Sequence, residues 1–301
     1  MKINLVATGG TIGSRLDGDG AIVISDAATA QIADIIGANE VFSQFKIHSA
    51  GIGFGDFFKL KGIIERAAVG ADGVIVTHGT DTLAFLSAYL AYAFCDTGIP
   101  IVLCAADEPL TDDYSNGFDV LNAAKSFIAQ KRSGVYVMYK NPGAVVRIHH
   151  GARLVPAHMH EDFYFSIGNS TFSDTGVMHG MDFDLQSVEN TVLCVLPYVG
   201  MNYAAYDMRG YKAVVQVAYH SGRVNAGEFD KFASRYPDIP IYLTAGRKKY
   251  GDGELAPNVI QCHGITQTAL YVKLLIGVKN NVKDLTAFVK KNACGEIVKE
   301  R

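Results

Sequence analysis

The sequence has little of what marks a secreted, disulfide-bonded or nucleic-acid-binding chain. It contains no tryptophan and only 5 cysteines in 301 residues. The cysteines are odd in number, scattered and without a Cys-x-x-Cys pair, which favours free thiols in a reducing compartment over a disulfide framework. The formal net charge of −3 provides no basic surface, so we expect no nucleic-acid partner.

Long apolar runs are also missing. The longest apolar helical stretch, residues 83–94, is shorter than the ~20 residues that a membrane-spanning helix needs, so we expect no membrane partner. Residues 1–7 lead directly into a glycine turn, without the apolar core of a secretion signal. Together these features predict a cytoplasmic protein.

What the chain does have is a large apolar fraction in alternating strand and helix patterns. It is 49% hydrophobic, and a prior of ~100–200 residues per domain suggests two domains. The least periodic stretch, residues 172–187, is the candidate linker, which gives domains at 1–180 and 188–301. Strands are expected at residues 3–7, 45–50, 74–77, 99–105, 135–139, 192–197, 213–217 and 239–244. This alternation predicts an α/β fold with a parallel sheet and right-handed crossovers in each domain.

Polar side chains gather where one expected strand ends. The buried-strand pattern at residues 74–77 is followed by His78-Gly79-Thr80-Asp81-Thr82, and helical spacing begins directly afterwards. In open α/β sheets, ligands bind at this edge, where helix amino termini attract negative charge. The simpler alternative is that Asp81 only caps the helix.

A second turn of this kind opens the chain. The strand at residues 3–7 runs into Thr8-Gly9-Gly10-Thr11-Ile12-Gly13, where glycines allow a tight turn and a close approach to a ligand. Alone, it could be a plain connection from strand to loop. Two such turns in one domain favour a binding or catalytic site.

These two segments resemble the two signature motifs of the bacterial-type L-asparaginase (asparaginase/glutaminase) family. Residues 98–103, 134–139 and 264–275 resemble further parts of the family pattern. The resemblance implies two parallel-sheet α/β domains, a larger N-terminal flavodoxin-like one and a smaller C-terminal one. It also implies hydrolysis of the side-chain amide of a small amino acid with release of ammonia, no cofactor, and a homodimer or homotetramer.

The resemblance also assigns roles to single residues. Thr11 would be the nucleophilic or carbonyl-facing threonine, and Thr80 with Asp81 would form the second catalytic pair and bind the substrate's ammonium group. Gly10, Ser49, Gly79 and Asp81 would line the substrate site. Ser49 could instead be a serine that ends a strand and bonds backbone groups.

Two positions depart from the family pattern. The family keeps a tyrosine in the loop after the first threonine, where this chain has Ala21. It keeps a lysine three residues after the arginine of a Gly-x-Arg segment, where this chain has Pro156. General acid–base help is worth ~100- to 10,000-fold, so this loss matters. Lys140, at the end of the strand at 135–139, and His158 are candidate substitutes, although Lys140 could be an ordinary surface lysine.

Other patterns give weaker hypotheses. His158 and His160 lie two apart before two acidic residues, but a third ligand at a suitable spacing is not evident, so we expect no metal. Residues 51–56 lack the last glycine of a dinucleotide fingerprint, so we expect no cofactor. Asp252 falls near the family's acidic residue that reaches a neighbouring subunit, although an Asp-Gly turn is a simpler interpretation.

The sequence thus predicts an asparaginase-like amidohydrolase that uses threonine hydroxyls. Two alternatives stay open because of Ala21 and Pro156. The chain could be a catalytically silent protein that binds a small amino acid as a sensor, or an amidase for a different amide.

Overall fold

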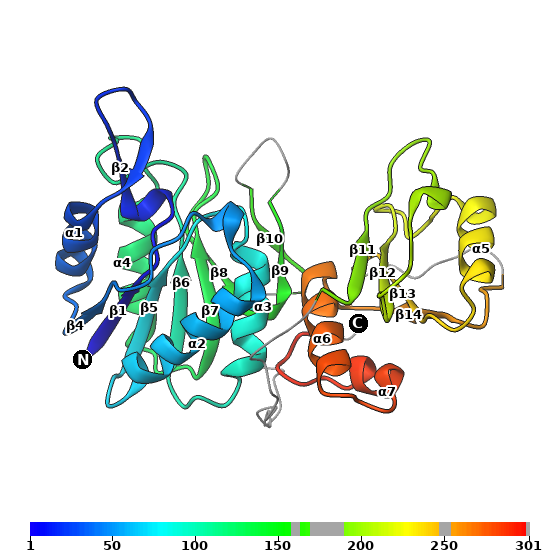
Figure 1. Cartoon of the computed structure of the whole chain (residues 1–301). Coiled ribbons are helices and arrows are strands. Elements are labelled where there is room, and N and C mark those ends of the chain that lie inside the picture. The colour runs from blue at the N-terminus through cyan, green and yellow to red at the C-terminus, as the bar shows by residue number, and fades with distance from the viewer. Residues whose placement is uncertain (158–162, 169–189, 247–253, 299–301) are drawn as a thin grey trace.

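The computed structural model describes residues 1–157, 163–168, 190–246 and 254–298 (Figure 1). The candidate linker at 172–187 lies outside these ranges, so the predicted domain limits at 180 and 188 stay a prediction. Within the described ranges, no helix is both long enough and apolar enough to cross a membrane.

The larger sheet has six strands in the order β4-β1-β5-β6-β7-β8. The first five are parallel and β8 is antiparallel to β7. The strands are β1 Ile3–Ala7, β4 Glu40–Phe42, β5 Gly73–Thr77, β6 Pro100–Cys104, β7 Gly134–Tyr139 and β8 Arg147–His150. The parallel α/β architecture expected from the sequence is therefore confirmed.

Helices cover both faces of this sheet because its strands are apolar on both sides. Val74 and Val76 of β5 point into a core shared with α2 (Phe54–Ala68) and α3 (Leu83–Ala93). Ile75, between them, belongs to the opposite core, beneath α1 (Asp26–Ile36) and α4 (Gly117–Ile128). The two-residue alternation of a strand thus sends successive side chains of β5 into different cores.

One crossover differs from the expectation of uniform handedness. The connections β5-α3-β6 and β6-α4-β7 step in the same direction across the sheet. Their helices nevertheless lie on opposite faces, since α3 packs in one core and α4 in the other. The two connections therefore have opposite hands, and the prediction that all crossovers are right-handed is wrong for one of them.

The strand predicted at residues 45–50 is also wrong. The edge strand is β4, and Ser49–Gly51 forms a short 3-10 helix, η2. The intervening chain crosses the end of β1, where the Ile47 N–H donates to the Thr8 carbonyl at 2.8 Å. This path brings Ser49 to the carboxyl edge of the sheet.

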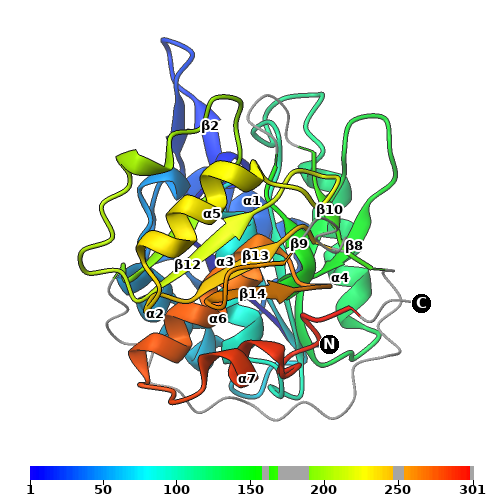
Figure 2. The same ribbon diagram turned by 90° about the vertical axis from the view of Figure 1, so that its right-hand side faces the viewer.

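The smaller sheet has four parallel strands in the order β11-β12-β13-β14. They are β11 Val192–Val195, β12 Ala213–Val217, β13 Ile241–Thr244 and β14 Val259–Cys262. Helix α5 (Ala226–Arg235) covers one face, and α6 (Gln267–Lys279) covers the other and is followed by α7 (Leu285–Lys290). Figure 2 looks onto this part of the molecule, with α5 in front.

The two sheets share a hydrophobic core through α6. This helix packs against α3, and both belong to one continuous cluster of buried side chains. The Tyr92 hydroxyl on α3 donates to the Ala269 carbonyl on α6 at 3.1 Å. Figure 1 shows α6 between the sheets.

Two short hairpins complete the described chain. β2 (Ser14–Leu16) and β3 (Ile22–Ile24) form an antiparallel pair after the first glycine turn. β9 (Leu154–Val155) and β10 (Phe165–Ser166) form the other pair, beyond β8.

Candidate functional site

The two threonine-bearing turns lie against each other at the carboxyl edge of the larger sheet. They follow the adjacent strands β1 and β5, whose last residues, Ala7 and Thr77, are paired. Gly10 has φ +75°, and a methyl group added there would lie 2.4 Å from the Gly79 nitrogen. Only glycine satisfies both demands, so it allows the two backbones to touch.

A third segment joins them through Ser49. A methyl group added at Gly79 would lie 2.3 Å from the Ser49 Oγ, so the serine sits directly over the second turn. Its hydroxyl donates to Asp81 Oδ2 at 2.9 Å. The structure therefore brings together Gly10, Gly79, Ser49 and Asp81, which the sequence assigned to one site.

Asp81 does not cap helix α3. The N-cap position is Thr82, and no side-chain cap bond is formed there. The Asp81 carboxylate is solvent-exposed and accepts from Ser49 instead. The capping alternative considered from the sequence is therefore wrong, and the charge is free to meet a ligand.

A buried chain of hydrogen bonds holds the turns from below. Thr8 Oγ1 donates to the Thr77 carbonyl at 2.6 Å and lies 3.2 Å from His78 Nδ1. His78 Nε2 lies 3.1 Å from Thr82 Oγ1, which lies 3.1 Å from the Ser49 carbonyl. Each threonine hydroxyl thus lies between one ring nitrogen of His78 and a backbone carbonyl, so the ring is held at both ends.

His78 is neutral near pH 7. Burial lowers its pKa from 6.5 to about 4, and the nearby Asp81 charge only partly opposes that effect. Both ring nitrogens already have partners within the chain of hydrogen bonds. His78 thus supports the turn and has no nitrogen to offer a substrate.

The two candidate nucleophiles differ from these neighbours. Thr11, at the start of the short helix η1 (Thr11–Gly13), and Thr80 are both half-buried. Neither hydroxyl has a hydrogen-bond partner among the described residues. Thr8, His78, Thr82 and Ser49 bond one another or the backbone, and the unpartnered Thr77 hydroxyl is fully buried. Thr11, Thr80 and Asp81 are therefore the accessible polar groups of the two turns.

Tyr164 is a site residue that the sequence did not reveal. Its side chain is 1% exposed, and its hydroxyl donates to the Thr80 carbonyl at 2.5 Å. The Asn141 side chain holds the Tyr164 backbone at both N–H and C=O, and the Tyr139 ring packs edge-on against the phenol. Tyr164 therefore fixes the backbone at one candidate nucleophile. The one sequence signal near Tyr164 is the aromatic run Phe163-Tyr164-Phe165, which indicates a strand but not a site residue.

Tyr164 also lies opposite one of the two departures from the family pattern. The pairing of Val155 with Phe165 makes Pro156 and Tyr164 cross-strand neighbours by register. The other departure, Ala21, is at the tip of the β2-β3 hairpin, where its N–H donates to Asp17 Oδ1 at 2.8 Å.

The substitutes proposed for the missing base are not seen at the threonines. Lys140 Nζ pairs with Asp119 on α4 at 2.5 Å, at the surface, which agrees with the simpler interpretation of an ordinary surface lysine. His158, His160 and Asp252 lie outside the described residues. In the ranges that the structure covers, no lysine or histidine forms a hydrogen bond with the hydroxyl of Thr11 or Thr80. No group of three or more potential metal ligands occurs in those same ranges.

Fold and site together define an α/β protein with two glycine turns meeting over a serine and an aspartate. The family described as "Asparaginase, N-terminal" matches residues 2–172, more than half of the chain. The chain therefore belongs to the asparaginase family, as the resemblance of its motifs indicated.

Relatives and solved structures agree with this assignment. A glutamyl-tRNA(Gln) amidotransferase subunit from Pyrobaculum aerophilum is 35% identical over 182 residues, which are 56% of this chain and 43% of that protein. The protein of the same name from Methanosphaera stadtmanae is 26% identical over 342 residues, covering 98% of this chain and 76% of that one. The thermostable L-asparaginase from Thermococcus kodakarensis has the same fold, with a TM-score of 0.81 at 22% identity over 100% of both chains.

The first of these matches is partial. The aligned part spans less than half the length of the P. aerophilum relative.

Proposed function

We propose that the chain is an amidohydrolase that hydrolyses the side-chain amide of L-asparagine or a related small amino acid. Thr11 and Thr80 supply the reacting hydroxyls, and Asp81, held by Ser49, binds the α-ammonium group. The observation that carries the proposal is the contrast at the site. The hydroxyls of Thr11 and Thr80 are accessible and free among the described residues, whereas the side chains of Thr8, His78, Thr82 and Ser49 are bonded.

The charge pattern suits an amino acid as ligand. An exposed carboxylate attracts an ammonium group, and the adjacent hydroxyls can face a carbonyl carbon. This proposal covers free hydrolysis as well as ammonia release within an amidotransferase, the activity for which the curated relatives are named. We also propose a homodimer or homotetramer in the cytoplasm, and the five free cysteines support the reducing compartment.

A second candidate is a protein that binds a small amino acid without turning it over. It is favoured by the ion pair between Lys140 and Asp119, which occupies the candidate base. A hydroxyl without a base near neutral pH loses much of its reactivity, although its hydrogen bonds to a ligand persist.

The test is ammonia release from asparagine and glutamine, measured side by side. If the first proposal holds, Thr11→Ala and Thr80→Ala each lower turnover at least ~100-fold, the low end of what an acid–base or nucleophilic group contributes. Thr97→Ala is the matched control, because Thr97 precedes β6 at the opposite edge of the sheet, and it should leave turnover unchanged.

A thermal-shift titration with aspartate separates the two candidates. Stabilisation without ammonia release establishes the binding protein, because a ligand that binds the native state raises its stability by mass action. Absence of both effects refutes both candidates for these amino acids, and a panel of larger amides then tests the remaining alternative.

A further inference from the structure

The hairpin that supports Thr80 is too short to hold itself. Its strands, β9 and β10, share only two residue pairs. An isolated two-stranded hairpin is marginally stable at best in water. Tyr164, directly before β10, nevertheless holds its hydroxyl 2.5 Å from the Thr80 carbonyl. Contacts from outside the hairpin must therefore keep Tyr164 in place.

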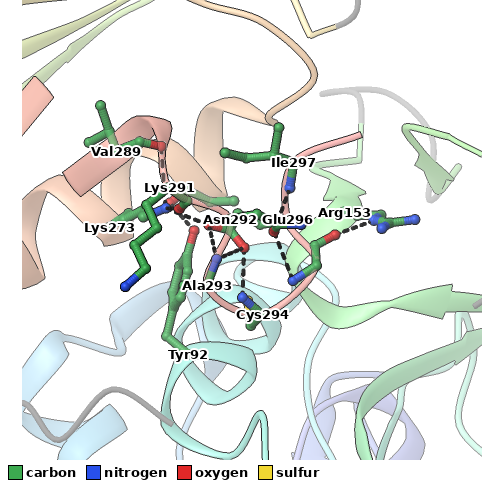
Figure 3. Close-up of polar contacts among 12 residues, drawn as sticks. Tyr92, Arg153, Lys273, Val289, Lys291, Asn292, Ala293, Cys294, Glu296 and Ile297 are labelled. Carbon is green, nitrogen blue, oxygen red and sulfur yellow. Dashed lines mark hydrogen bonds and ion pairs between the residues drawn. The ribbon is translucent and has the colours of Figure 1, made fainter. Parts of the chain in front are cut away.

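Arg153 bonds this hairpin to the C-terminal segment, residues 291–298. It directly precedes β9, and its carbonyl accepts the Ile167 N–H at 3.0 Å, which extends the pairing of β9 with β10. Arg153 is 7% exposed, and its Nε donates to the Gly295 carbonyl of the C-terminal segment (Figure 3). One buried residue thus connects both arms of the hairpin to that segment.

Val298, in the same segment, packs against the chain that leaves the hairpin. Gly168 has φ +79°, and a methyl group added there would lie 2.9 Å from Val298 Cγ2. On its other side, the Val298 N–H donates to the Gly264 carbonyl at 2.8 Å. Val298 therefore lies in close contact with both the hairpin and the loop that follows β14.

The C-terminal segment is itself fixed from inside the molecule. Glu296 pairs with Lys273 on α6, and both side chains are 0% exposed (Figure 3). The Glu296 carboxylate also accepts the N–H groups of Ala293 and Cys294. Because the segment is anchored in this way, it can hold the hairpin in position.

The aspartate of the site is held by a different contact. Ser49 donates to Asp81 Oδ2 at 2.9 Å, and the Ser49 carbonyl accepts from Thr82. No described residue of the hairpin forms a hydrogen bond with the side chain of Ser49 or Asp81. A shift of the hairpin should therefore displace Thr80 more than the Asp81 carboxylate.

From these contacts we infer that Arg153 is a positioning residue for Thr80. By bonding the C-terminal segment to the hairpin, Arg153 keeps the Tyr164 hydroxyl at the Thr80 carbonyl, and the position of that backbone sets the direction of the Thr80 hydroxyl. Arg153 acts through Tyr164 and forms no hydrogen bond with the Thr80 hydroxyl itself. The inference rests on the proposed function, in which Thr80 supplies a reacting hydroxyl.

The test compares kcat and KM for asparagine in Arg153→Met and Arg153→Lys. Methionine fills similar space but cannot donate, so kcat should fall ~10-fold or more, since a misplacement of ~1 Å can cost ~100-fold. KM should change less than kcat, because Asp81 keeps its bond to Ser49. Lysine can still donate to the Gly295 carbonyl, so Arg153→Lys should recover part of kcat.

Two controls separate positioning from a general loss of stability. Arg147→Met removes an exposed arginine of β8 and should leave kcat unchanged. Phe229→Leu leaves a cavity in the core beneath α5, so it should lower the free energy of unfolding without changing kcat. A fall in kcat for Phe229→Leu equal to that for Arg153→Met overturns the inference.

The double variant Arg153→Met/Tyr164→Phe tests the path. If Arg153 acts through Tyr164, the double variant should lose no more kcat than the worse of the two single variants. Losses that multiply would show that Arg153 acts by another route, which overturns the inference. If Arg153→Met does not fold, Val298→Ala replaces it in each comparison, with a smaller expected effect, because it loosens the contact with Gly168.

Hydrogen exchange distinguishes a failure of this inference from a failure of the proposed function. Absence of ammonia release by the unaltered protein refutes the proposed hydrolysis and leaves no kcat to compare. The Leu83 amide, which donates to the Thr80 carbonyl at 3.3 Å, should still exchange faster in Arg153→Met than in Arg147→Met. Equal exchange in these two variants overturns the inference, with or without ammonia release.

Discussion

At the scale of single residues, the candidate site contains buried side chains that support the two turns and accessible side chains that can meet a ligand. His78 and Tyr164 are buried and bond the turns from below. Asp81, Thr11 and Thr80 face solvent to different degrees. Because His78 and Tyr164 hydrogen-bond the two turns directly, replacing either residue should change the stability of the protein and the binding of its ligand.

Tyr164→Phe is the most conservative test of this support. It removes one hydroxyl, so the Thr80 carbonyl keeps only the Leu83 N–H, at 3.3 Å, as a donor. Loss of one hydrogen bond typically costs about 0.5–1.5 kcal/mol, which should appear in urea unfolding. Turnover, or aspartate binding if turnover is absent, should fall with it. Tyr114→Phe is the control, because Tyr114 is 91% exposed, and equal effects in both variants would contradict the role given to Tyr164.

The burial of His78 predicts a dependence of stability on pH. Its pKa is about 4 in the folded protein and 6.5 in the unfolded chain. Between these values the unfolded state binds more protons, so stability is complete above pH 6.5 and falls as the pH drops toward 4. The full contribution is on the order of 3 kcal/mol, at about 1.36 kcal/mol per pKa unit.

His78→Gln tests this linkage because glutamine cannot titrate in this range. Plots of unfolding free energy against pH should be shallower for the variant between pH 4 and 6.5. His149 and His150, whose pKa values burial also lowers to about 4, should keep part of the slope. A slope identical to that of the unchanged protein would mean that His78 does not titrate as its burial requires.

At the scale of elements, local patterns in the sequence predicted the two turns correctly but did not predict the segments that surround them. β1 and β5 are apolar runs that end in glycine and polar residues, so strand and turn were predicted together. β4 has three residues and exposes Val41, and its apolar signal is too weak to compete with residues 45–50. Tyr164 contacts a residue 84 positions away, through a hairpin whose register the sequence does not specify.

The contact between the two turns can be tested with one methyl group. Gly10→Ala demands a positive φ from alanine, which costs about 1–2 kcal/mol, and adds overpacking against Gly79, which costs about 1–3 kcal/mol more. Gly70 has φ +66° but open space around its Cα, so Gly70→Ala carries the first penalty alone. Chemical unfolding should show the larger loss for Gly10→Ala, together with loss of aspartate binding. Equal losses of unfolding free energy in the two variants would show that the two turns are not in close contact at Gly10 and Gly79.

At the scale of the whole molecule, a buried ion pair and a hydrogen bond from Arg153 link the chain's last described segment to α6 and to the larger sheet. Lys273 on α6 bonds Glu296, whose carboxylate also accepts N–H bonds from Ala293 and Cys294. Arg153, beside the larger sheet, donates through Nε to the Gly295 carbonyl (Figure 3). Burial would raise the pKa of Glu296, but Lys273 and the backbone donors outweigh it and hold the pKa below its usual value.

Removing one partner of this pair should be worse than removing both. Lys273→Met or Glu296→Gln leaves the other partner buried without its counter-charge, and breaking a buried pair typically costs about 3–5 kcal/mol. The double variant should recover part of that loss, because no uncompensated charge stays inside. Lys231→Met breaks the exposed pair with Glu228, and it should change stability by less than about 1 kcal/mol. Additive losses in the double variant would show that Lys273 and Glu296 stabilise the molecule independently, and that their ion pair is not what joins the last segment to α6.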